Sequence, residues 1–275
     1  MNRMGDAARR WREQLEAWAI PDEFLRAVPD SPWQHPTEVF AKRADSYVAK
    51  PVGVSWEKAI AALEPRGVVL DVGAGAGAAS LPLARATTEL IAVDQSRTML
   101  DALSVRAASL NLPTRLVQGT WPATSSTVDK ADVVVCHHVF YNVADLAPFA
   151  QALTDHARRR VVVELPPAHP MRALNPLWLR LHGLRRPDGP TADDAVTVLT
   201  ELGLDVHRER WPRPPRTPYG SFVDMVASTR RRLCLPAERD SELMDALLEL
   251  GVDPDHPVDL PDRDGADLVT LWWDR

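Results

Sequence analysis

The stretch VVLDVGAGAGAAS at residues 68–80 decides the fold of this chain. It begins with a run of mostly β-branched residues, which is typical of a strand buried on both faces. Gly73, Gly75 and Gly77 follow, and glycines at such a turn let the chain bend sharply and let a ligand touch the backbone. We expect a helix at residues 78–86, whose amino-terminal N–H groups would point at that ligand.

Short apolar runs alternate with segments of helical length through the middle of the chain. This alternation predicts a doubly wound α/β domain, in which helices cover both faces of a mostly parallel sheet. The proline-rich residues 166–218 break the pattern and contain one expected helix, 191–202. The other expected elements are strands at 68–72, 90–93, 115–117, 132–136, 161–165, 204–211 and 266–273, and helices at 96–110 and 144–157.

The sequence pattern predicts a division at about residue 65. Residues 1–64 are expected to hold four helices that form a cap or lid. Residues 65–275 are expected to form the α/β domain, with a helical insertion at about 218–264 before the last strand. The first helix carries an apolar stripe that could pack on the protein's own core or close over its site, form a dimer interface, or lie on a membrane surface. The stripe consists of Met4, Ala8, Trp11, Leu15 and Trp18.

Composition narrows the class of protein. The 275 residues are 45% hydrophobic and 25% charged, which is typical of a globular protein and excludes disordered and collagen-like chains. No apolar run is long enough to span a bilayer and the first residues do not resemble a secretory signal, so we expect a cytoplasmic protein with no membrane partner. Cys136 and Cys234 lack metal-ligand spacing, so we expect neither a metal site nor a disulfide framework. The net charge of −6 argues against a nucleic acid partner.

Two classes of cofactor use a glycine turn of this kind. A dinucleotide interpretation takes Gly73, Gly75 and Ala78 as the phosphate-binding motif and places Asp94, 21 residues after Gly73, on a ribose. Asp71 favours a cofactor with an amino acid tail, because its carboxylate would repel a pyrophosphate but attract an ammonium group.

Taken together, these residues resemble the class I S-adenosylmethionine-dependent methyltransferase family. The resemblance rests on Asp71 and the glycine turn, on Asp94 at the end of the second strand, and on DVVVCHHVFYNV at residues 132–143. It covers residues 66–165 well, and the expected helix 191–202 and strands 204–211 and 266–273 in outline. It implies a Rossmann-like, seven-stranded sheet of order 3-2-1-4-5-7-6 with strand 7 antiparallel, and S-adenosylmethionine as the cofactor.

The resemblance also implies which residues hold the cofactor. The glycine turn would hold the methionine part, and Asp94 would accept hydrogen bonds from both ribose hydroxyls, unless it caps the next helix instead. The family's adenine-binding Asp after strand 3 is absent, so Thr120 is expected to bond the adenine, with Trp121 and Met99 against its ring or in the core. The full predicted set is Asp71, Gly73, Ala74, Gly75, Gly77, Asp94, Gln95, Met99, Thr120, Trp121 and His137.

Catalytic candidates are expected at the carboxyl ends of the strands, where open α/β sheets bind ligands. Methyl transfer is an in-line displacement that needs alignment and exclusion of water, and a base helps where the acceptor is a hydroxyl. The candidates are His138, Tyr141 and Glu164, with His169 close to the end of strand 5. Because side chains alternate, only one of His137 and His138 is expected to face the site.

The acceptor is expected to be a small molecule, methylated on oxygen or nitrogen. The Asp/Asn-Pro-Pro-Tyr motif of nucleic acid and protein methylation is absent after strand 4, and so are the acidic residues of metal-dependent members. Trp11, Trp18, Trp33 and Phe40 of the first helices would form an apolar lid together with the insertion. A nicotinamide-dependent oxidoreductase, a non-catalytic methyltransferase-like assembly partner and an RNA methyltransferase remain alternatives. The apolar stripe of the first helix also leaves a homodimer open.

Overall fold

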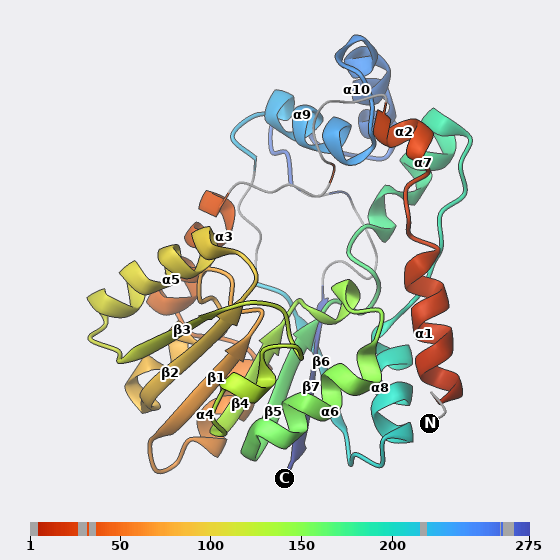
Figure 1. Ribbon diagram of the computed structural model, residues 1–275. Coiled ribbons are helices and arrows are strands. Elements are labelled where there is room, and N and C mark those ends of the chain that lie inside the picture. The colour runs from red at the N-terminus through yellow and green to blue at the C-terminus, as the bar shows by residue number, and fades with distance from the viewer. Residues whose placement is uncertain (1–4, 27–31, 33–36, 215–218, 259, 261–266) are drawn as a thin grey trace.

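In a computed structural model, the chain is built around one seven-stranded sheet (Figure 1). The structure describes residues 5–26, 32, 37–214, 219–258, 260 and 267–275. The strand order is β3-β2-β1-β4-β5-β7-β6, and only β7 runs antiparallel to its neighbours, which confirms the predicted sheet. The strands are β1 (Gly67–Val72), β2 (Thr87–Asp94), β3 (Thr114–Gln118), β4 (Ala131–His137), β5 (Ala157–Leu165), β6 (His207–Pro212) and β7 (Asp267–Asp274).

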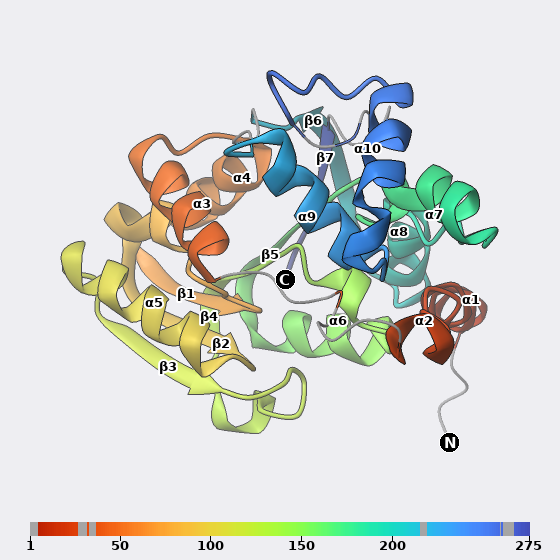
Figure 2. The same ribbon diagram turned by 90° about the horizontal axis from the view of Figure 1, so that it is seen from above.

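Helices surround the sheet on both faces and beyond one edge (Figures 1 and 2). The expected helix at residues 78–86 is instead a shorter 3₁₀ helix, η1 (Leu81–Ala86), with Pro82 in its first turn. The α-helices are α1 (Asp6–Glu16), α2 (Asp22–Arg26), α3 (Thr37–Ala49), α4 (Val54–Ala62), α5 (Arg97–Ser109), α6 (Leu146–His156), α7 (Asn175–His182), α8 (Ala192–Glu201), α9 (Phe222–Arg232) and α10 (Asp240–Glu249).

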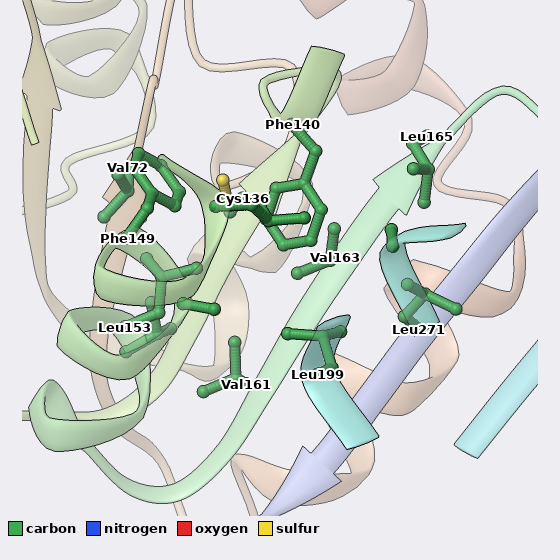
Figure 3. Packing of buried hydrophobic residues seen from close by; sticks show 14 of the residues in the cluster. Val72, Cys136, Phe140, Phe149, Leu153, Val161, Val163, Leu165, Leu199 and Leu271 are labelled. Carbon is green, nitrogen blue, oxygen red and sulfur yellow. The ribbon is translucent and has the colours of Figure 1, made fainter. Parts of the chain in front are cut away.

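The first face of the sheet is covered by α6, α8 and α1. Trp11 of α1 is fully buried in this core, and its indole N–H donates to the Val143 carbonyl at 2.8 Å. Ala8 and Trp18 are buried as well, so the described part of the apolar stripe packs on the protein's own core, while Met4 lies outside the described residues. Figure 3 shows the centre of this core, with Val72, Cys136, Phe140, Phe149, Leu153, Val161, Val163, Leu165, Leu199 and Leu271.

The second face is covered by α3, α4, α5 and η1, which enclose a separate core. Val69, Ala92, Val135 and Val162 point to this face. Strand side chains alternate, so the residue two positions beyond each of them lies on the same face. These residues are Asp71, Asp94, His137 and Glu164, and all four stand at or near the carboxyl ends of β1, β2, β4 and β5.

A third core lies beyond the carboxyl ends of the strands, where α2, α7, α9 and α10 pack together (Figures 1 and 2). The insertion before the last strand is helical as predicted, because α9 and α10 fall within it. The prediction of a single helix in residues 166–218 is wrong. The structure adds α7, in which Pro176 stands at the first turn and Gly183 ends the helix in the left-handed conformation, both favourable positions.

Candidate functional site

The glycine turn after β1 leaves one position open to a ligand. A Cβ atom at Gly73 would lie 2.4 Å from the Val139 side chain, and one at Gly77 would lie 2.6 Å from Leu81, so both glycines are required by packing. A Cβ atom at Gly75 would meet no atom within 4 Å, although the residue has a left-handed φ of +50°. Free space beside an exposed backbone is what a close-fitting ligand needs.

Asp94 stands beside this open position. One carboxylate oxygen accepts the Gly75 N–H at 2.8 Å and the other accepts the Ser96 N–H at 2.8 Å. Each carboxylate oxygen can accept a further hydrogen bond, so two ribose hydroxyls could still donate to Asp94. The cap of the next helix is Ser96 and not Asp94, the alternative that the sequence left open, because the Ser96 hydroxyl accepts the Met99 N–H at 3.3 Å.

Asp71 lies beneath the turn and is fully buried. Neither of its carboxylate oxygens makes a hydrogen bond of good geometry among the described residues, although the Ser80 hydroxyl lies close to them. Burial raises the pKa of Asp71 to about 7; the Ser80 hydroxyl opposes this shift and the Asp94 carboxylate adds to it. A buried polar group without a partner is costly, so these oxygens are suited to receive a ligand's ammonium group.

These features fit the cofactor that the sequence predicts. The open position at Gly75, the remaining acceptor capacity of Asp94 and the unpartnered oxygens of Asp71 match a ligand that carries a ribose and a cationic amino acid tail. The two carboxylates have no cationic partner among the described residues, which also favours binding of a positively charged group here.

The structure places the other predicted cofactor residues at varying positions around the turn. Ala74 is buried in the second core, and its N–H donates to the Val93 carbonyl at 3.0 Å. Gln95 is exposed, and Met99 is half-buried on the first turn of α5, both close in sequence to Asp94. Thr120 is exposed just beyond β3, whose last residue pairs with Asp94.

Trp121 does not lie with these residues, which corrects the predicted contact with adenine. Its ring packs against the first core and meets the His156 ring edge-on at 4.9 Å. His156 is the last residue of α6, at the end of the helix from which β5 begins. Trp121 therefore lies across the sheet from Asp94, and the alternative of a core aromatic is the better interpretation.

Three predicted residues meet in one polar cluster at the ends of β4 and β5. The Nε2 atom of His138 lies 3.1 Å from Oε1 of Glu164, and the hydroxyl of Ser55 donates to Oε2. The Nε2 atom of His137 is buried without a partner, and burial lowers the pKa of this imidazole, against the charge of Glu164. His138 has a left-handed φ of +60°, which breaks the alternation of the strand.

Both histidines consequently line the same pocket, which corrects the expectation that only one would. The pocket adjoins the glycine turn through Ala78 and Ala79, and its opposite wall is formed by α3 and α4. Its lining residues are Tyr47, Val52, Ser55, Trp56, Ala59, Ala78, Ala79, Pro82, Val135, His137, His138 and Glu164.

Tyr141 lies in the core and not in this pocket, which argues against its predicted catalytic role. Its hydroxyl donates to the Pro166 carbonyl at 2.9 Å, and its ring stacks on Trp11 at 5.7 Å. Burial raises the pKa of the hydroxyl well above its usual value. His169 is buried beside it and stacks on Trp18 at 4.0 Å, and burial lowers its pKa to about 4.

Sequence reasoning missed Ser55 and the rest of the α4 wall. Ser55 contacts Glu164 across 109 residues of sequence, and no local pattern predicts such a contact. Trp33 and the Phe40 side chain, predicted in the lid, lie outside the described residues. Within the described part of the chain no group of three or more His, Cys, Asp or Glu is arranged to hold a metal ion. None of its helices is long and apolar enough to cross a membrane.

Comparisons with known proteins agree with this fold. Residues 69–160 match a family model described as a methyltransferase domain. Ubiquinone biosynthesis O-methyltransferase of Bartonella tribocorum is 31% identical over 84 residues, a stretch that covers 30% of this chain and 34% of that protein. The chain thus spans about a third of the length of this curated relative.

Solved structures of similar fold cover far more of the chain. The YcgJ protein from Bacillus subtilis has a TM-score of 0.53 at 18% identity, covering 80% of this chain and 97% of its own. A putative methyltransferase from Bacillus halodurans has a TM-score of 0.51 at 16% identity, covering 83% and 98%. The plantazolicin methyltransferase BamL, solved with a substrate analogue and S-adenosylhomocysteine, has a TM-score of 0.50 at 13% identity, covering 97% and 98%.

The sheet order and the glycine turn define a class I methyltransferase fold. Residues 69–160, which carry the turn, Asp94 and the end of β4, match the model of the methyltransferase domain family.

Proposed function

We propose that this protein is an S-adenosylmethionine-dependent methyltransferase that acts on a small molecule. The observation that carries the proposal is the open backbone position at Gly75 beside Asp94, within the residues that match the methyltransferase domain. The unpartnered carboxylate of Asp71 supports it further, because it lies under the same turn.

The glycine turn, Asp94 and Asp71 would each hold a different part of the cofactor. The glycine turn gives the methionine part access to the backbone, Asp94 accepts the ribose hydroxyls, and Asp71 attracts the ammonium group. Met99, Gln95 and Thr120 border the side on which the adenine is expected. When bound, the cofactor would supply a methyl carbon on a sulfonium, which an acceptor would attack in line as the sulfur leaves as a thioether. The protein would align the two and exclude water.

We place the binding site of the methyl acceptor under the helices that lie beyond the carboxyl ends of the strands. We propose that the cap consists of α2, α7, α9 and α10, which share the third core, and not of residues 1–64 alone. In Figure 2 α9 extends over the edge at which β4 and β5 end. The matched curated relative is named as an O-methyltransferase, which supports a small-molecule acceptor here.

Calorimetric titration with S-adenosylhomocysteine tests the proposal. We expect binding well below ~1 mM for the full chain, and a loss of at least ~10-fold, or ~1.4 kcal/mol, in Asp94→Ala. Asp101→Ala is the matched control, because among the described residues this exposed carboxylate on α5 pairs with Arg97 and does not face the glycine turn's Asp94. Absence of binding at ~1 mM, or equal binding by Asp94→Ala and wild type, would refute the proposal. Titration with NADH should give no signal; binding would instead support the oxidoreductase alternative.

A further inference from the structure

The cluster of Ser55, His138 and Glu164 points to the chemical class of the acceptor. We infer that the methylated atom is the oxygen of a hydroxyl group and that His138 removes its proton, with Glu164 and Ser55 as positioning residues. This inference rests on the proposed function and specifies its acceptor.

Glu164 determines which nitrogen of His138 carries the proton. The carboxylate is buried, with 4% of the residue exposed. Burial would raise the pKa of Glu164, but the charge of His137, the hydrogen bond and charge of His138, and the hydrogen bond of Ser55 together lower it to about 2. An ionised carboxylate can only accept hydrogen bonds, so Nε2 of His138 must donate. In the neutral imidazole, Nδ1 therefore carries the lone pair.

Ser55 fixes the carboxylate from the other side. It donates to Oε2 of Glu164, which leaves Oε1 for His138, and it stands at the start of α4, a helix packed on β4 and β5. The backbone also holds His138, whose N–H donates to the Glu164 carbonyl at 2.7 Å. Left-handed backbone at a residue other than glycine is uncommon and costly, and such strain concentrates at functional sites.

His138 is accessible, in contrast to the carboxylate that orients it. Its side chain is 30% exposed and borders the pocket that adjoins Ala78 and Ala79 of the glycine turn. The other titratable groups around it are Glu164 on β5, His137 on β4 and Tyr47 on α3. Within the described part of the chain His137 makes no hydrogen bond to a carboxylate through Nε2, so His138 is the imidazole that is oriented to act as a base.

A base oriented in this way is needed when the atom that accepts the methyl group is the oxygen of a hydroxyl. A hydroxyl with a pKa of about 10 or more is a weak nucleophile at neutral pH until its proton is removed, whereas a neutral amine already presents its lone pair. As the acceptor oxygen forms the new C–O bond, the C–S bond breaks with its electron pair going to sulfur, and the hydroxyl proton passes to Nδ1 of His138. The Glu164 carboxylate stabilises the imidazolium that results, and the proton then leaves to water.

The first measurement is the tautomer of His138, read from ¹⁵N NMR of the histidine-labelled full chain with S-adenosylhomocysteine. We expect Nε2 protonated and Nδ1 bare in the neutral ring, with the signal assigned by its loss in His138→Asn. Asn is chosen because it tolerates left-handed backbone. A proton on Nδ1 of the neutral ring would overturn the inference.

The second measurement compares two probes that differ only in the acceptor atom, 4-methylphenol and 4-methylaniline, with labelled S-adenosylmethionine. We expect methylation of the hydroxyl probe, a fall in kcat of ~100-fold or more in His138→Asn with little change in KM, and a smaller fall in Ser55→Ala. His207→Asn is the control, since this exposed ring stacks on Trp272 away from the pocket. Methylation of the amino probe at a rate independent of His138 would overturn the inference.

The two proposals fail in different ways. If neither probe is methylated, the NMR measurement of the His138 tautomer alone supports or overturns the inference. Absence of S-adenosylhomocysteine binding contradicts the proposed function itself, whereas binding together with the wrong tautomer contradicts only the assignment of the base and the acceptor atom.

Discussion

Gly75→Ala separates cofactor binding from stability more cleanly than any other change at the glycine turn. A Cβ atom there would meet nothing within 4 Å, so the cost to the fold is backbone strain alone. An L-residue in the left-handed region costs about 1 kcal/mol, so the free energy of unfolding should fall by about that amount. The added methyl group occupies the space in which we place the cofactor, and we expect its affinity to fall at least ~10-fold, or ~1.4 kcal/mol.

Gly203→Ala is the matched control. Gly203 also has a left-handed φ, +78°, and no atom within 4 Å of its Cβ position, but it lies just after α8, away from the turn. Urea unfolding should show similar losses of stability in both variants, and calorimetry with S-adenosylhomocysteine should show weaker binding only in Gly75→Ala. If Gly75→Ala binds as tightly as wild type, or if Gly203→Ala loses as much affinity, the placement of the cofactor at the turn is wrong.

Three further changes test the burial of single side chains. The folded-state pKa of Asp71, about 7 against a usual 3.8, means that wild-type stability falls as pH rises from about 4 to about 7, by at most ~4 kcal/mol. Asp71→Asn should abolish this fall in urea unfolding while weakening S-adenosylhomocysteine binding; parallel pH curves for the two proteins would contradict the shift. Tyr141→Phe should cost about 1 kcal/mol through its lost bond to Pro166 and leave turnover unchanged, so a large loss of kcat at full stability would restore its catalytic role. Trp11→Ala should lower the free energy of unfolding by about 3–5 kcal/mol, and a loss below about 1 kcal/mol would mean that α1 does not pack on the core as described.

The α/β architecture could be predicted because its signals are local and repeated. Strands buried on both faces are continuous apolar runs, and Ser96 and Thr191 are caps that can be recognised before a helix. The turn is followed by a 3₁₀ helix and not by an α-helix, and the local sequence does not distinguish the two, because Pro82 stands in the first turn, where either accepts it. The sequence does not predict α7, because residues 166–218 are rich in proline, which usually ends a helix. Pro176, however, stands in the first turn of α7, where a helix accepts proline.

The site could be predicted only where a residue's position in a strand determines its face. Asp71 and Asp94 follow apolar strand residues by two positions, so alternation places both on one face. Trp121 lies in a loop, where no period applies, and it packs on the other face. The positive φ of His138 is equally invisible to alternation, and the bond between Ser55 and Glu164 depends on packing between distant segments.

A crystal structure of the full chain with S-adenosylhomocysteine tests the central claim most directly. The account predicts ligand density against the backbone at Gly75, with the ribose hydroxyls within hydrogen-bond distance of the Asp94 carboxylate and the amino group directed toward Asp71. Density elsewhere in the molecule, with Asp94 still bonded only to the N–H groups of Gly75 and Ser96, would contradict it.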